Sequence, residues 1–323
     1  MLNLFLSNRS TTVIIIPIVL LVFWFGSFFQ ALPVNANPTF VYALFYDVLA
    51  AYPVYNRIFG FVAAVFLIFF INRIFNTNDF YSQENAVPSI VLIIMLGAWS
   101  GFHFFSPIYI SMVFLLMAIN RVLRIYHQKA VLRELFDASF FIGIAALFHY
   151  PLALFVLSIY GFLFISRSFS FREAMLPLLG LSLPFYFLGV AFFYFDIQPD
   201  FFKYSNPETI KSLLFEGGLT QRFYLVITVI LLSVSLFYLF RLFERSKVQV
   251  QLSRKFLLIF FINGVLVYWV CLVYYPIIES ALFLVLPMAL IIPFFIFESK
   301  PLIQNLGFYF WLISALLFDY LLI

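Results

Sequence analysis

Charged side chains are scarce in this chain of 323 residues. Asp, Glu, Lys and Arg make up 10% of the residues and hydrophobic types 65%, whereas soluble domains are about 25% charged. Apolar runs of about 20 residues, the length that crosses a bilayer, recur from Thr12 to the last residue and leave no room for a soluble domain. The sequence therefore predicts an all-α fold, a polytopic bundle of membrane helices that forms a single domain over residues 1–323.

Cysteine and cofactor motifs are also lacking. The one cysteine, Cys271, excludes an intrachain disulfide and a cysteine-based metal site. There is no P-loop, no dinucleotide-binding glycine pattern and no zinc-ligand spacing, so the sequence identifies no cofactor and no metal, and we expect no nucleic-acid partner. No row of charges follows the apolar runs, which argues against a pump or an ion-coupled transporter.

Three prolines decide the topology. The stretch ALFHYPLALF, residues 146–155, lies in an apolar run of about 28 residues, which is long for one span and short for two. A proline disfavours helix in the residue before it, and both flanks of the run are basic. The positive-inside rule places both flanks in the cytoplasm, which requires a hairpin with Pro151 at the outer interface. We interpret Pro107 and Pro276 in the same way.

We expect about eleven spans, with the N-terminus cytoplasmic and the C-terminus periplasmic. The fifth and sixth spans look short, so we expect them to be tilted, partly re-entrant or shielded by neighbours. Four basic residues fall outside, leaving 14 of the 18 Lys and Arg residues on the cytoplasmic side of a bacterial inner membrane. The predicted spans are residues 12–32, 57–74, 87–104, 107–124, 138–149, 151–166, 174–195, 222–242, 256–275, 279–297 and 305–323.

Two predicted outer loops, residues 33–56 and 196–221, are longer than a turn, and function is expected in such segments. The middle of the first is interpreted as an amphipathic helix on the membrane surface. Asp47 lies within it. A carboxylate partly desolvated there would have a raised pKa and could accept a proton from an attacking hydroxyl. The alternatives are a polar edge of the surface helix or an ion pair with Arg57.

Several cationic or titratable side chains share the predicted outer face. Arg57 has a planar fork that suits phosphoryl oxygens, although a salt bridge or a lipid headgroup contact explains it equally well. His103 and His149 each precede a hairpin tip, where they could contact a lipid-linked pyrophosphate, ligate a metal together with a carboxylate, or serve as amphipathic interfacial residues. The remaining candidates for binding a phosphate or a lipid carrier are Lys203, Lys211 and Arg222. Asn263 is expected to bond to a neighbouring helix.

This layout of two substantial outer loops and short hairpins resembles the GT-C superfamily of polytopic glycosyltransferases, which use polyprenyl-phosphate sugars. The resemblance implies a catalytic carboxylate in the first outer loop, where Asp47 is the matching position, and a lipid carrier beside the second long loop. The family usually has a pair of acidic residues soon after the first span, whereas this chain has one. The layout is also similar to uncharacterised bacterial inner-membrane families.

Two functions remain open at this point. The first is transfer of a sugar from a polyprenyl-phosphate donor at the periplasmic face, with Asp47 as base. The second is a non-catalytic accessory or scaffold subunit of a membrane complex for envelope biogenesis or protein translocation. The expected partners are membrane lipids, a polyprenyl-phosphate-linked substrate and other inner-membrane proteins. A lipid or solute transporter ranks last, because it would need a continuous polar path.

Overall fold

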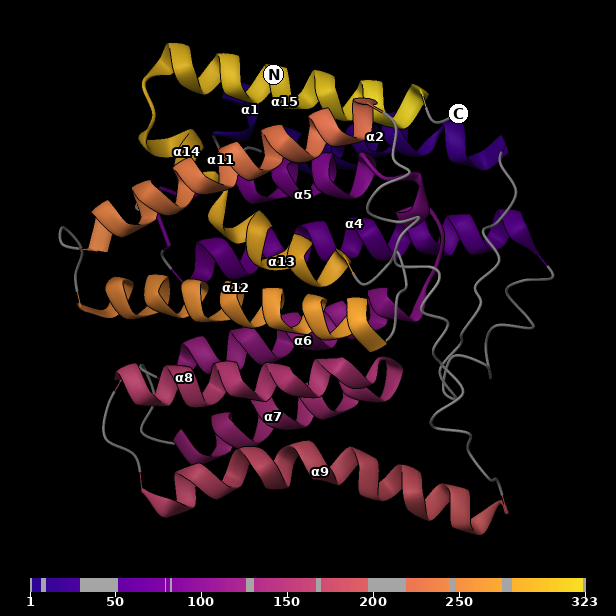
Figure 1. Cartoon of the computed structure of the whole chain (residues 1–323), viewed down its shortest axis with the longest axis vertical. Coiled ribbons are helices and arrows are strands. Elements are labelled where there is room, and N and C mark those ends of the chain that lie inside the picture. Colours follow the sequence, from indigo (N-terminus) through magenta and orange to yellow (C-terminus); the bar gives the residue numbers. More distant parts are fainter. Residues whose placement is uncertain are drawn as a thin grey trace.

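The computed structural model shows a bundle of helices, and no strand occurs among the residues that it describes. The all-α prediction is confirmed. The helices lie roughly parallel to one another, and the chain reverses direction between successive long helices (Figure 1). The described residues are 2–6, 10–29, 52–78, 80–81, 83–125, 131–166, 170–196, 219–243, 248–274 and 281–321.

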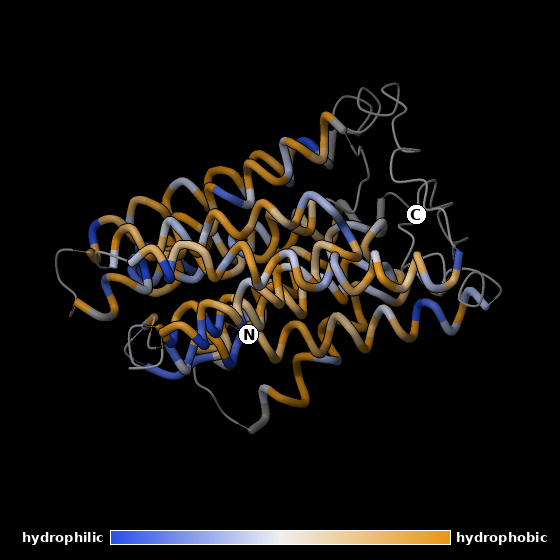
Figure 2. Tube along the Cα trace, turned by 90° about the horizontal axis from the view of Figure 1, so that it is seen from below, coloured by the Kyte–Doolittle hydropathy of each residue, from blue (hydrophilic) through white to orange (hydrophobic). Residues whose placement is uncertain are grey.

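Among the described residues, five helices are long and apolar enough to cross a membrane. Hydrophilic residues gather toward the two ends of the bundle and hydrophobic residues fill its length (Figure 2). Large apolar side chains also face outward, among them Phe193 with 88% and Leu302 with 70% of its surface exposed. Such an exterior is unfavourable in water and favourable in lipid. The five helices are Pro53–Thr77, Pro107–Arg124, Phe171–Tyr194, Arg222–Phe243 and Val250–Val273.

We name the two ends of the bundle after arginines that they bury. The Arg57 end, on the right of Figure 1, is where α2 ends and α4 begins, and the Arg254 end, on the left, is where α4 ends and α12 begins. The elements of the first half are α1 (Leu2–Phe5), α2 (Ser10–Trp24), η1 (Gly26–Phe29), α4 (Pro53–Thr77), α5 (Val87–Gly97), η2 (Ser100–Phe102), α6 (Pro107–Arg124), α7 (Val131–Phe148), η3 (Tyr150–Phe155) and α8 (Val156–Ser166).

The second half continues the same pattern. Helix α9 lies at one edge of the bundle, at the bottom of Figure 1, while α11 to α15 pack around α5 and α4 on the other side. The elements are α9 (Phe171–Tyr194), α11 (Leu219–Phe243), α12 (Val248–Tyr274), α13 (Leu282–Ile291), α14 (Pro293–Glu298) and α15 (Pro301–Leu321).

The predicted reversal at Pro151 is confirmed. Helix α7 ends at Phe148, His149 adopts an extended conformation with φ −154° and ψ 102°, and Pro151 lies in the first turn of η3. The chain then returns along α7 through η3 and α8 (Figure 1). A residue that precedes a proline but is separated from it by one position can end the helix in an extended conformation, and the proline then disfavours helix at Tyr150. The chain therefore turns here.

Of the other two predicted reversals, the structure describes the one at Pro107 and not the residues around Pro276. Pro107 starts α6 directly after the N-cap residue Ser106, whose hydroxyl accepts a hydrogen bond from the N–H of Ile108 at 3.4 Å, and α6 returns antiparallel to α5 (Figure 1). That reversal is confirmed. Pro276 lies outside the described residues, although α12 and α13 on either side of it run in opposite directions (Figure 1).

The predicted fifth span, residues 138–149, lies mostly within a longer helix. Helix α7 begins at Val131, and charged residues in its first two turns are paired. A carboxylate oxygen of Glu134 lies 3.3 Å from Nη1 of Arg121, and one of Asp137 lies 3.6 Å from the same nitrogen. Because these charges are paired, they are tolerated in the first turns of the helix, although a span predicted from hydrophobicity begins only after them. The third span was too long, since α5 ends at Gly97.

Helix α9 joins the bundle mainly through α7. Two glycines allow the approach: Gly180 lies against Ser139, and a Cβ on Gly143 would lie 2.8 Å from the carbonyl oxygen of Leu181. Small residues at a helix contact let two membrane helices pack closely, which explains how one helix anchors α9. The opposite face of α9 is left exposed.

Candidate functional site

Two of the predicted phosphate-binding residues meet at the Arg57 end. Arg57 lies in the second turn of α4 and His103 directly follows η2, and their exposed fractions are 3% and 1%. The positive charge of Arg57 is close enough to act electrostatically on the His103 ring. His103 also stacks on Trp24 from α2, with ring centroids 4.4 Å apart and planes inclined by 27°. The site therefore draws on three segments that are far apart in the sequence.

The backbone around this site is held by α4. The side-chain oxygen of Asn56 accepts a hydrogen bond from the N–H of Phe105 at 2.8 Å. A Cβ on Gly60, one turn further along α4, would lie 2.6 Å from the carbonyl carbon of Phe104, so only glycine allows this approach. The connection between α5 and α6, which carries His103, is thereby fixed against the first two turns of α4.

The site contains a buried N–H donor that has no hydrogen-bond acceptor. Within the described part of the chain, the indole nitrogen of Trp24 is buried without a hydrogen bond. The backbone carbonyls of Leu96 and Gly97 are hydrogen-bond partners of the His103 ring. Buried polar groups are normally satisfied, so the indole N–H indicates a position for an acceptor such as a phosphate or carboxylate oxygen.

Asp47 lies outside the described residues, as do Lys203 and Lys211. In the sequence, Asp47 precedes Tyr52 by five residues. Tyr52 is the N-cap residue of α4, the helix that carries Arg57.

The other two predicted residues that the structure describes are His149 and Arg222. His149 is buried, with Nε2 3.3 Å from Sγ of Cys271 and its ring centroid 5.0 Å from that of Phe283. It thus fastens the turn after α7 to α12 and α13. Arg222 is exposed in the first turns of α11. No group of three or more metal-ligating side chains occurs among the described residues, so a shared metal site of His103 and His149 has no support there.

Sequence reasoning missed the other buried arginine, Arg254. Its Nε and Nη2 donate to the carbonyl oxygen of Phe80 at 3.2 and 3.0 Å, and its Nη1 donates to the carbonyl of Leu242 at 3.2 Å. The guanidinium carbon lies 5.7 Å from the ring centroid of Phe294. Every residue has a backbone carbonyl, so the sequence cannot show which carbonyls Arg254 binds. The sequence shows only that an arginine lies next to a long apolar run.

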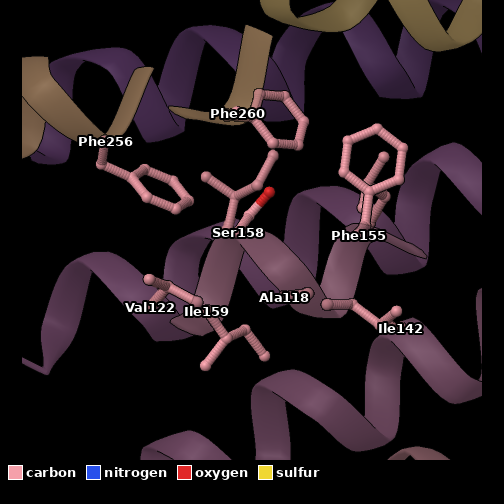
Figure 3. Close-up of a pocket in the computed structure, with 10 residues that line it drawn as sticks. Ala118, Val122, Ile142, Phe155, Ser158, Ile159, Phe256 and Phe260 are labelled. Atoms are coloured by element: carbon pink, nitrogen blue, oxygen red, sulfur yellow. The ribbon is translucent and has the colours of Figure 1, made fainter. Parts of the chain in front are cut away.

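The middle of the bundle contains a polar contact and a small cavity. As predicted, Asn263 bonds a neighbouring segment: its Nδ2 donates to Oγ of Ser158 at 2.8 Å and to the carbonyl of Leu154 at 3.0 Å. Beside it, Phe155, Phe260 and the Ser158 side chain line an apolar cavity of about 10 Å³ (Figure 3). That volume is close to the smallest that holds one water molecule, so this cavity is a packing defect.

Comparison with known proteins adds no functional assignment. The chain matches no family model, no curated protein and no solved structure.

Proposed function

We propose that the protein is a GT-C-like protein of the bacterial inner membrane that binds a polyprenyl-phosphate-linked sugar at the Arg57 end and transfers the sugar to an acceptor hydroxyl. One observation carries the proposal: a buried arginine lies beside His103 and Trp24, and the indole nitrogen of Trp24 has no hydrogen-bond acceptor among the described residues. A phosphate supplies several strong acceptor oxygens and a charge that Arg57 complements. In the sequence, Asp47 lies five residues before Tyr52, the N-cap residue of the helix that carries Arg57.

The chemistry assigns a role to each residue. Asp47 accepts the proton of the acceptor hydroxyl, whose oxygen then attacks the anomeric carbon of the sugar. The bond between that carbon and the phosphate oxygen breaks, and the polyprenyl phosphate leaves with the bonding electron pair. Arg57 and His103 stabilise the negative charge that develops on the phosphate, which is the largest catalytic contribution that a fixed site can make.

Sugar transfer from a polyprenyl-phosphate donor by the purified full chain in nanodiscs tests this mechanism. We expect Asp47→Asn to lower the rate by about 100-fold or more, the usual contribution of a general base. Arg57→Lys keeps the charge but loses the planar fork, so a smaller loss is expected. Arg73→Gln, at an exposed site near the end of α4 and far from Arg57, is the control and should retain full activity. Unchanged transfer by the Asp47 variant would exclude the mechanism.

A non-catalytic subunit of a membrane complex is the second candidate, and burial favours it. Arg57 and His103 are at most 3% exposed, as are residues that serve packing alone. Extraction in mild detergent separates the two proposals. A stable complex whose yield is unaffected by Asp47→Asn supports the subunit, and a monomer that turns over the sugar donor supports the enzyme.

We further propose eleven spans with a cytoplasmic Arg254 end. Support comes from the alternating helix directions (Figure 1) and from the basic residues that gather at the Arg254 end. Because the single native cysteine is buried, only an introduced cysteine should react with a maleimide, and its reaction shows on which side of the membrane it lies. Ser170→Cys should react only when a membrane-impermeant maleimide reaches the cytoplasm, and Tyr52→Cys should react from outside. The opposite pattern would invert the topology. The basic residues concerned include Arg73, Arg121, Arg124, Arg241 and Arg254.

A further inference from the structure

A groove opens at the Arg254 end, between the first turn of α7 and the first turns of α9. Its volume is about 300 Å³ and its walls are apolar except for one cation. Its lining is largely exposed, with Phe171 at 78% and Leu179 at 60%. The lining residues are Leu132, Phe171, Arg172, Met175, Leu176 and Leu179. It lies far along the bundle from the Arg57 end, because α7 and α9 both begin at the left of Figure 1.

The rim of this groove carries positive charge that its acidic neighbours do not neutralise. Arg172 makes no ion pair within 4.0 Å with a described residue. The adjacent Glu173 is turned to cap α9, where its carboxylate accepts a hydrogen bond from the N–H of Ser170 at 3.0 Å. Beside Leu132, the side chain of Arg133 is 78% exposed. Its Nε lies 3.9 Å from a carboxylate oxygen of Asp137, a long contact for an ion pair.

We propose that this groove binds one anionic phospholipid from the leaflet at the Arg254 end. An acyl chain lies along Met175, Leu176 and Leu179, and the headgroup phosphate bonds to Arg172. The combination of an apolar trough with a cation at its mouth complements an acyl chain joined to a negative headgroup. A volume of about 300 Å³ is at the lower limit of ligand sites and fits a single chain better than a protein helix. The inference is independent of the function proposed for the Arg57 end.

Native mass spectrometry of the detergent-purified full chain tests the proposal. The protein is equilibrated with equal amounts of phosphatidylglycerol and phosphatidylcholine that carry the same acyl chains. We expect one retained phosphatidylglycerol, and an about five-fold lower retention for Arg172→Gln, the effect of losing about 1 kcal/mol from one basic residue at a membrane surface. Arg73→Gln is the matched control, because Arg73 is exposed on α4 at the same end. It should retain the lipid as the wild type does.

A second variant tests the groove itself. Leu176→Trp fills the trough and keeps the charge of Arg172, and it should also lower phosphatidylglycerol retention while the far-ultraviolet circular dichroism stays that of a folded helical protein. Equal retention of the two lipids, or no loss in either variant, overturns the proposal. So does displacement of the lipid by excess inorganic phosphate, which would identify a phosphate site without a chain, or a dimer mass that disappears in Leu176→Trp, which would identify a second copy as the occupant.

Discussion

The two ends of the bundle each bury an arginine, and they satisfy it in different ways. At the Arg254 end, the guanidinium donates to the carbonyls of Phe80 and Leu242. At the Arg57 end, the arginine lies beside His103 and Trp24, and the indole nitrogen of Trp24 has no hydrogen bond within the described residues. A saturated buried cation is structural, whereas a site with a spare donor is suited to a ligand.

The Arg254 end is tied together further by Tyr81, in the connection between α4 and α5. Its hydroxyl donates to the carboxylate of Glu298, and its ring stacks on Phe297 with centroids 4.1 Å apart. Burial, and then the negative charge of Glu298, raise the pKa of Tyr81 above its ordinary value. The same carboxylate acts on Arg254. This end therefore has the properties of a fixed structural network.

The largest effect on stability is expected from Arg254→Met. The substitution keeps the length of the side chain but leaves two buried carbonyls and Glu298 without their cation, so the free energy of unfolding should fall by about 3 kcal/mol. Titration with sodium dodecyl sulfate in mixed micelles, followed by circular dichroism, measures it. Arg241→Met, at an exposed site near the same end, is the control and should change stability little. If the two variants lowered the free energy of unfolding equally, Arg254 would have no special structural role.

Gly60→Ala tests the backbone support of the Arg57 end. The new Cβ would lie 2.6 and 2.7 Å from backbone atoms of Phe104 and Phe105, which cannot move without releasing the bond to Asn56. We expect the free energy of unfolding to fall by about 2 kcal/mol in the same titration. Gly189→Ala is the matched control, because no atom lies within 4 Å of its added Cβ and alanine favours helix. A neutral result for Gly60→Ala would show that the two segments are not held together.

Asn263→Ala tests the middle of the bundle, between the two ends. It removes the hydrogen bonds to Ser158 and Leu154, and such bonds between membrane helices contribute about 0.6 kcal/mol each. We expect a loss of about 1 kcal/mol in the free energy of unfolding. Ser182→Ala, which removes only a bond within its own helix at an exposed site, should have a smaller effect. A loss as large as that of Arg254→Met would make the middle, not the Arg254 end, the main polar anchor.

His103→Phe should affect stability least. The new ring can still stack on Trp24, and one neutral hydrogen bond from the His103 ring to the carbonyls of Leu96 or Gly97 is lost. A neutral hydrogen bond contributes about 0.5–1.5 kcal/mol, and we expect a loss at the lower limit, about 0.5 kcal/mol. The titration used above measures it. A loss of several times that size would show that His103 has a further structural partner and would weaken the contrast between the two ends.

Local features of the sequence predicted the fold well. Composition indicates membrane helices, and the reversals at Pro107 and Pro151 follow from the geometry of proline, which acts on its immediate neighbours. The start of α7 could not be predicted, because the charges of Glu134 and Asp137 are accommodated by Arg121 on another helix. That pairing exists only once the helices have packed.

The candidate site was predictable only in part. Arg57 and His103 were each singled out by position and chemistry, but nothing in the sequence places either beside Trp24. Arg254 escaped notice because its partners are backbone carbonyls, which every residue carries. Asp47, Lys203 and Lys211 lie outside the described residues and remain predictions.

The central claim is that the Arg57 end binds the phosphate of a lipid carrier, whereas the buried Arg254 at the other end stabilises the fold. The most direct measurement is the affinity of the purified full chain for polyprenyl monophosphate in nanodiscs. We expect His103→Phe to raise the dissociation constant by about ten-fold, the value of one charge-assisted hydrogen bond, with little loss of stability. Arg254→Lys, at the other end, should leave the affinity unchanged. Equal affinity in the wild type and His103→Phe would contradict the account.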